Sequence, residues 1–130
     1  LVEIPNYIIF SVKSTLPKVK MSRIHAKQVL QNLISNAVKY CDEVSGLIEI
    51  DYKYENQDHI VSIRDNGRGI ESKYFKKIFQ IFQSLETHED STGIGLSIVK
   101  KIMDHYNGDV WVNSIVGKGS IFYIRIKDDR

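Results

Sequence analysis

The 130-residue sequence predicts one α/β domain in which helices cover one face of a mixed sheet. Apolar residues recur at helical spacing in two long segments, residues 22–40 and 96–106. Segments that alternate apolar and polar residues, as half-buried strands do, lie before, between and after them. With 42% hydrophobic residues, the chain is long enough for one core and too short for two. We therefore expect residues 1–130 to form one two-layer sandwich of about five strands and about three helices.

Five segments are expected to form strands. Residues 46–54 alternate in the way a strand with one buried face does, and residues 59–65 repeat that pattern. The turn-like residues Asn56-Gln57-Asp58 between them predict a hairpin. The five predicted strands are residues 7–12, 46–54, 59–65, 109–115 and 120–126, of which the last two are joined by Gly117-Lys118-Gly119.

Three segments are expected to be helical. The first begins after Ser22 as N-cap and runs to about Tyr40. A short one, Lys73 to Ile81, carries an aromatic stripe of the kind that usually packs in a core. The last runs from Leu96 to about Tyr106 and ends at Asn107-Gly108 like a helix with a glycine cap. On the first helix, five apolar side chains share one arc and are predicted to face the core: Ala26, Leu30, Leu33, Ile34 and Ala37.

Composition excludes several classes of protein. The formal net charge of +2 provides no large basic field for nucleic acid. Cys41 is the only cysteine, so an internal disulfide is excluded, and no Cys/His group has zinc-site spacing. No apolar run approaches the roughly 20 residues that span a bilayer. A reducing, cytoplasmic location is therefore expected, and because Leu1 is not an initiator methionine we expect the chain to be a piece of a longer protein.

The predicted strand at residues 59–65 ends on a carboxylate and a glycine turn. Asp65 can accept a hydrogen bond from an exocyclic amine such as that of adenine. Gly67 and Gly69 allow positive φ and let a flat ligand approach the backbone. Asp-Asn-Gly is also a common turn sequence, so a polar turn without a ligand is an equal alternative at this point.

A polar stripe runs along the first helix. Asn32, Asn36, Lys39 and Tyr40 lie within about 100° of one another at helical spacing. A solvated face is the ordinary interpretation, although two asparagines are mediocre helix formers for such a face. Farther along, Gly93-Ile94-Gly95 opens a helix, and a helix N-terminus preceded by glycines offers unpaired N–H groups to an anion. Residues 83–92, which precede it, have no apolar period and are expected to form a loop.

Together these features resemble the Bergerat-fold ATP-binding domain (HATPase_c, GHKL) shared by sensor histidine kinases, gyrase, the large heat-shock chaperone and mismatch-repair ATPases. The resemblance covers about residues 22–126 and is strongest to the catalytic domain of two-component sensor histidine kinases. Five segments look like that family's boxes in the family's order: residues 28–40 (N box), 65–70 (first glycine box), 78–82 (phenylalanine box), 92–100 (second glycine box) and 117–122 (final glycine box).

The resemblance implies a role for each matching residue. Asp65 would bind the adenine amine and Tyr40 would lie against the ring, while Asn36 and Asn32 would supply oxygen to Mg²⁺ and Lys39 would meet phosphate. Residues 83–92 would form a lid over ATP. The implied nucleotide contacts are Asn36, Lys39, Tyr40, Asp65, Gly67, Gly69, Ile70, Phe79, Thr92, Gly93, Ile94, Gly95 and Leu96, and the implied catalytic residues are Asn32, Asn36 and Lys39.

One position distinguishes related activities of the superfamily. Water-splitting members carry a glutamate as general base where this chain has Asn32, and an amide cannot accept a proton near neutral pH. The resemblance therefore implies transfer of the γ-phosphoryl group to a histidine. Two departures from the family pattern are Ser91, where a further glycine is common, and Gln83-Ser84, where many members carry a basic residue.

None of the four histidines lies in the family's acceptor pattern. The acceptor is therefore expected on an upstream dimerisation and phosphoacceptor hairpin, with a response regulator as indirect partner. The isolated domain would be a monomer and the whole protein a homodimer whose other segments can include a membrane anchor. Two alternatives stay open: a protein serine kinase of the same fold, and a module that binds nucleotide without catalysis.

Overall fold

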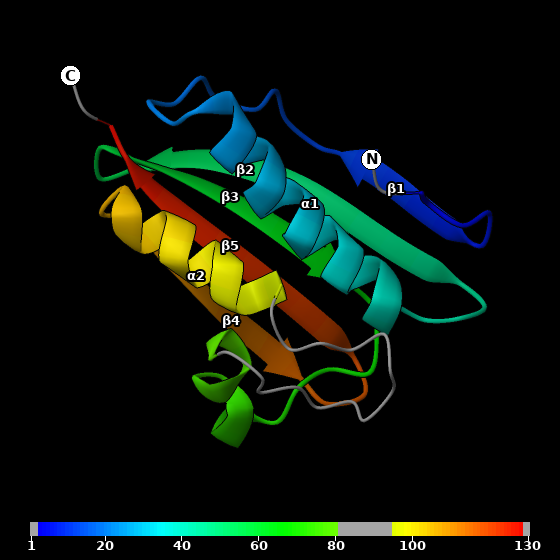
Figure 1. Ribbon diagram of the computed structural model, residues 1–130. Helices are drawn as coiled ribbons and strands as arrows, with labels where there is room; N and C mark the ends of the chain where they lie inside the picture. The colour runs from blue at the N-terminus through cyan, green and yellow to red at the C-terminus, as the bar shows by residue number, and fades with distance from the viewer. Residues whose placement is uncertain (1–2, 81–94, 129–130) are drawn as a thin grey trace.

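The structure is a computed structural model that describes residues 3–80 and 95–128 (Figure 1). Its elements follow the chain as β1 (Ile8–Val12), α1 (Arg23–Tyr40), β2 (Gly46–Glu55), β3 (Asp58–Asp65), the 3-10 turns η1 (Ser72–Tyr74) and η2 (Lys77–Phe79), α2 (Gly95–His105), β4 (Asp109–Ile115) and β5 (Gly119–Lys127). The predicted loop at residues 83–92, with Thr92, Gly93 and Ile94, lies outside the described residues.

The strands form one mixed sheet in the order β1-β2-β3-β5-β4. Strand β1 pairs with β2 in parallel, and every other pairing is antiparallel. The β2–β3 hairpin turns at Asn56 and Gln57, which both have positive φ, as the tight hairpin connection requires. The register places Asp65, at the end of the central strand β3, opposite Ile48 on one side and Ser120 on the other.

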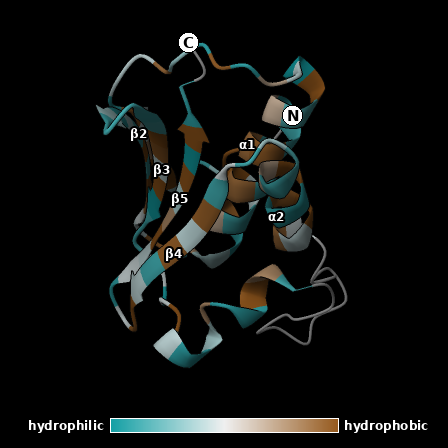
Figure 2. Cartoon of the chain, turned by 90° about the vertical axis from the view of Figure 1, so that its left-hand side faces the viewer, coloured by the Kyte–Doolittle hydropathy of each residue, from teal (hydrophilic) through white to brown (hydrophobic). Residues whose placement is uncertain are grey.

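Both α-helices lie on the same side of the sheet (Figures 1 and 2). Helix α1 begins at its Ser22 cap, whose hydroxyl accepts a hydrogen bond from the His25 N–H at 3.3 Å. The helices pack on each other and on the inner face of the sheet. The largest fully buried side chains lie between these layers: Phe122, Leu33, Ile48, Ile63, Met103, Val29 and Val99. The predicted two-layer α/β fold is thus confirmed.

Three local predictions need correction. The described part of the helix predicted at residues 73–81, which stops at Gln80, is not one helix but contains the two 3-10 turns, because it is short and sets Lys73 and Lys77 at repulsive i,i+4 spacing. Helix α2 ends close to where it was predicted to end, but its left-handed cap residue is Asn107 instead of the glycine, and Gly108 donates its N–H to the Met103 carbonyl at 2.8 Å.

The buried face of α1 also differs from the predicted arc. Val29 is buried together with Leu33 and Ala37, whereas Ala26, Leu30 and Ile34 are only partly buried. The reason is that α1 packs against α2 as well as against β2 and β3, so its buried sector is turned toward both neighbours.

Candidate functional site

Asp65 is a buried carboxylate at the end of β3. Only 5% of the residue is exposed, and its Oδ1 accepts a hydrogen bond from the Gly67 N–H at 2.9 Å. Burial raises its pKa from an ordinary 3.8 to about 6, against the opposing effect of backbone hydrogen bonds from Gly67 and Ser120. The fold therefore holds an ionisable acceptor in a site that disfavours its charge.

The turn after Asp65 packs directly on the end of α1. A Cβ on Gly67 would overlap the carbonyl oxygen of Tyr40, the last residue of that helix. The Asn66 side chain fixes the turn from the other side, since its Oδ1 accepts from the Leu47 N–H at 2.9 Å and its Nδ2 donates to the Ser45 carbonyl at 2.7 Å. Gly67 is thus required for close contact between the Asp65 turn and Tyr40.

The β4–β5 turn supports the same segment. The Gly117 N–H donates to the Arg68 carbonyl at 2.7 Å, and the Ile70 N–H donates to the Ser114 hydroxyl at 2.7 Å. Gly69 has φ of 77°, and a Cβ on it would overlap the Ile115 carbonyl. The segment that looked like a final glycine box therefore packs against the first one.

Two serines in this support were missed by the sequence reasoning. The Ser114 hydroxyl lies 2.7 Å from that of Ser120, which is 5% exposed, and Ser114 also donates to the Gly119 carbonyl at 2.8 Å. The available signal was the position of Ser120 immediately after the last glycine, where an apolar strand residue would be ordinary. The role of Ser114 could not be predicted from the local sequence, because its hydrogen-bond donor Ile70 lies 44 residues away in the chain.

The polar stripe of α1 connects the Asp65 turn to the start of α2. Asn32 Oδ1 lies 3.9 Å from the position of a Cβ on Gly95, the first residue of α2. The Asn32 Nδ2 atom is buried and has no hydrogen-bond partner among the described residues. Because Asn36 lies one turn after Asn32 and one turn before Tyr40, the stripe runs from α2 to the turn that holds Asp65.

The other predicted contacts come from the glycine turn, from η2, from α2 and from the end of α1. Ile70, Phe79 and Leu96 are partly buried against the core, and the Phe79 ring meets Phe122 edge to face at 6.1 Å. Lys39 is exposed, with its Nζ 5.5 Å from the centre of the Tyr40 ring. Thr92, Gly93 and Ile94 lie outside the described residues.

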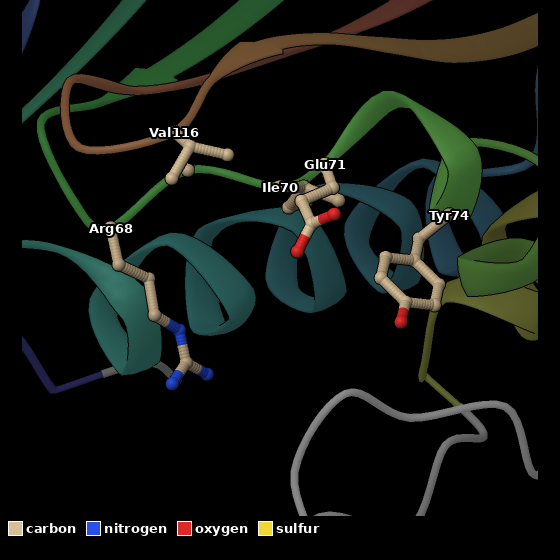
Figure 3. A pocket seen from close by; sticks show the side chains of 6 residues that line it. Arg68, Ile70, Glu71, Tyr74 and Val116 are labelled. Atoms are coloured by element: carbon tan, nitrogen blue, oxygen red, sulfur yellow. The ribbon is translucent and has the colours of Figure 1, made fainter.

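A cavity of about 340 Å³ opens beside the glycine turn (Figure 3). Its lining residues come from the turn, from η1 and from the β4–β5 connection: Arg68, Gly69, Ile70, Glu71, Tyr74 and Val116. Isoleucine, tyrosine and valine give it apolar walls beside one cation and one anion. A hollow therefore lies between the glycine turn, η1 and the β4–β5 connection.

The other features of the described part of the chain do not form a second candidate functional site. His25 Nδ1 lies 2.6 Å from the Tyr106 hydroxyl and so ties the start of α1 to the end of α2, which supports a structural role. Within residues 3–80 and 95–128, no three metal-binding side chains converge. None of the helices described there is both long enough and apolar enough to cross a membrane.

Comparisons with known proteins agree with this geometry. Residues 21–130 match the family described as histidine kinase-, DNA gyrase B-, and HSP90-like ATPase. The chain is 39% identical over 114 residues to the phytochrome-like protein Cph1 of Synechocystis sp., an alignment that covers 86% of this chain and 15% of Cph1.

Solved structures of two kinases share the fold. The catalytic domain of histidine kinase ThkA matches with a TM-score of 0.77 at 30% identity, covering 93% of this chain and 78% of that one. Full-length ShkA in complex with AMPPNP matches with a TM-score of 0.76 at 27% identity, over 92% of this chain and 25% of ShkA. The resemblance read from the five motifs is thereby confirmed, and this chain belongs to the histidine kinase-, DNA gyrase B-, and HSP90-like ATPase family.

Proposed function

We propose that this chain is the ATP-binding catalytic domain of a two-component sensor histidine kinase. The observation that supports it most is the single stripe on α1, which has Asn32 beside the start of α2 and Tyr40 beside the Asp65 turn. A ligand along that stripe meets a buried acceptor at one end and a helix N-terminus at the other. ATP has the matching order of groups, because its base carries an amine and its phosphates are anions.

Base recognition rests on Asp65 and the groups around it. The carboxylate accepts the adenine N6–H, which guanine cannot offer because it carries an acceptor oxygen at that position. Tyr40 stacks on the ring, and Ile70, Phe79 and Leu96 provide apolar surface. Gly67 and Gly69 keep the backbone close enough for the flat base to enter.

Phosphate and metal binding rest on the opposite part of the stripe. The residues present fit a magnesium ion, since amide oxygens are the hard, neutral ligands that Mg²⁺ accepts beside phosphates and waters. Asn36 and Asn32 would hold it, and when bound it neutralises charge on the β- and γ-phosphates. The Asn32 Nδ2, which has no partner among the described residues, donates to an anionic oxygen, and Lys39 and the N-terminus of α2 at Gly95 add positive potential.

Asn32 also determines which acceptor can react. The Asn32 amide cannot deprotonate water as a carboxylate at that position would, so a nucleophile that needs little activation is favoured. A neutral imidazole forms a P–N bond as the P–O bond to ADP breaks, and its ring proton passes to a base on the acceptor domain. The residues of this chain bind ATP, orient its γ-phosphoryl group for transfer and exclude water from the site.

The acceptor histidine and the dimer contacts belong to segments outside this chain. This catalytic domain works on an upstream dimerisation hairpin of its own or a partner chain, in the cytoplasm, and a response regulator receives the phosphoryl group afterwards. The large difference in length from Cph1 supports such additional domains.

Nucleotide titration tests the proposed site. Calorimetry of the wild type should detect Mg-ATP binding, which Asp65→Asn should abolish and the control Asp104→Asn, on the exposed side of α2, should preserve. Asn36→Ala should weaken Mg-ATP binding much more than binding of metal-free ADP. Equal losses in both titrations would contradict the metal role of Asn36, and unchanged affinity in Asp65→Asn would overturn the site.

Transfer is tested by supplying a phosphoacceptor hairpin in trans with γ-labelled ATP. Acid-labile phosphohistidine on the hairpin is the expected product, and it should disappear in Asn36→Ala. An acid-stable phosphoserine product would instead assign the chain to the serine kinases of this fold. Binding of ATP without any transfer to hairpins of several sensor kinases would indicate a regulatory module.

A further inference from the structure

Arg68 stands between the two glycines of the Asp65 turn, and its guanidinium lies against Tyr40. The guanidinium carbon is 4.4 Å from the centre of the Tyr40 ring, well inside the roughly 6 Å range of a cation–π contact. Figure 3 shows the Arg68 side chain extending from the turn alongside the C-terminal end of α1. A charged side chain of the turn therefore contacts the ring that the proposed function places against adenine.

The backbone that carries Arg68 is held on both sides. Its carbonyl accepts the Gly117 N–H at 2.7 Å, so the β4–β5 turn fixes it from one direction. On the other side, Gly67 packs against the Tyr40 carbonyl without room for a Cβ. The origin of the Arg68 side chain is consequently fixed relative to the end of α1, and the guanidinium reaches the ring from a constant position.

Tyr40 needs such a contact because of where it lies. It is the last residue of α1, and the following residue, Cys41, is already extended with ψ of 170°. No further helical turn restricts the Tyr40 ring, which is only partly buried. Ordering a free side chain when a ligand stacks on it costs conformational entropy, and a contact that orders it beforehand removes part of that cost.

We propose that Arg68 is a positioning residue that holds the Tyr40 ring in the orientation that receives the adenine base. The inference rests on the proposed nucleotide site and adds the residue that pre-orders its aromatic wall. Arg68 then acts on the base end of the ligand and not on the phosphates. Arg68 should therefore contribute equally to the affinities for adenosine, ADP and ATP.

The test measures affinity for these three ligands by displacement of a fluorescent ADP analogue. Arg68→Ala should weaken all three by a similar factor, roughly two- to fivefold, as expected for loss of an exposed cation–π contact. Arg68→Lys, which keeps the cation without the planar group, should recover part of the loss. Lys101→Ala, which removes one exposed positive charge from α2, is the charge-matched control and should change none of the affinities.

A double-mutant cycle separates this role from a general structural one. In a Tyr40→Leu background, Arg68→Ala should have no further effect, because the group through which it acts is gone. Additive losses, a loss confined to ADP and ATP, or unchanged affinity in Arg68→Ala would each overturn the inference. Any of these results with normal ATP binding by the wild type would leave the proposed function standing, whereas a wild type that binds none of the three ligands would overturn both.

Discussion

Replacing Asp65 with asparagine should make the protein more stable while it removes nucleotide binding. The carboxylate is 5% exposed, and burial raises its pKa from 3.8 to about 6. Between these two values the folded state binds a proton that the unfolded state has released. Stability therefore falls as pH rises through that window, and above about pH 6 the folded protein carries the full cost of an ionised, buried carboxylate.

The magnitude follows from the size of the pKa shift. A shift from 3.8 to about 6 corresponds to roughly 3 kcal/mol at neutral pH, taking about 1.4 kcal/mol for each pKa unit. Asparagine keeps an oxygen that can accept the Gly67 N–H and carries no charge, so it avoids this cost. For a chain of this size, 3 kcal/mol corresponds to a rise in Tm on the order of 10 °C, which is an upper bound.

The assay is urea and thermal unfolding of wild type and Asp65→Asn, followed by circular dichroism near pH 7.5 and again near pH 4. The increase in the free energy of unfolding of Asp65→Asn over wild type should be present at the higher pH. It should shrink strongly at the lower pH, where the wild-type carboxyl is largely protonated in the folded state. Asp51→Asn is the matched control: Asp51 is exposed, and a hydrogen bond from Ser14 lowers its pKa, so its replacement should give no gain. No gain in Asp65→Asn at pH 7.5, or an equal gain at both pH values, would refute the reasoning.

Three further predictions follow from the same geometry. The affinity for adenosine, which has no titrating phosphate, should fall as pH is lowered below about 6, because Asp65 then becomes protonated; an NMR titration that finds constant affinity from about pH 8 to about pH 5 would contradict this. Gly67→Ala should abolish ATP binding with retained circular dichroism, since its methyl group would overlap the Tyr40 carbonyl; normal affinity by calorimetry would mean that the turn can shift freely. Phe122→Ala should destabilise the fold by about 3 to 5 kcal/mol in urea unfolding through loss of a fully buried ring, and a loss below about 1 kcal/mol would show that the core collapses around the gap.

Helices and strands could be predicted from the sequence wherever a periodic pattern of apolar residues extends over many positions. Helix α1 begins at its Ser22 cap and ends at Tyr40 as expected, and the strand that delivers Asp65 ends at that residue. These elements are determined by local patterns of apolar residues and by capping side chains, which act over a few positions. The mixed sheet with helices on one face followed from the order of those elements.

Contacts between segments distant in the chain could not be predicted from such local patterns. The Ser114 hydroxyl that receives the Ile70 N–H is determined by the pairing of β4 with β5 and by the path of the glycine turn. The contact of Arg68 with Tyr40 likewise depends on how that turn packs against α1. The 3-10 turns at residues 72–79 reflect a short segment with repulsive charges, where an aromatic stripe alone favoured a helix.

Two buried polar groups of the described residues support the proposed ligand. Asp65 is a buried acceptor whose charge is disfavoured, and Asn32 Nδ2 is a buried donor without a partner among the described residues. They lie at opposite parts of one helix-lined stripe, because Tyr40 contacts the Asp65 turn and Asn32 lies beside Gly95. A ligand that relieves both must offer a donor at one end and an acceptor at the other, joined by a flat apolar surface that can rest on Tyr40. An adenine nucleotide meets all three requirements, so under the proposed function its binding recovers stability that is lost when these groups are buried.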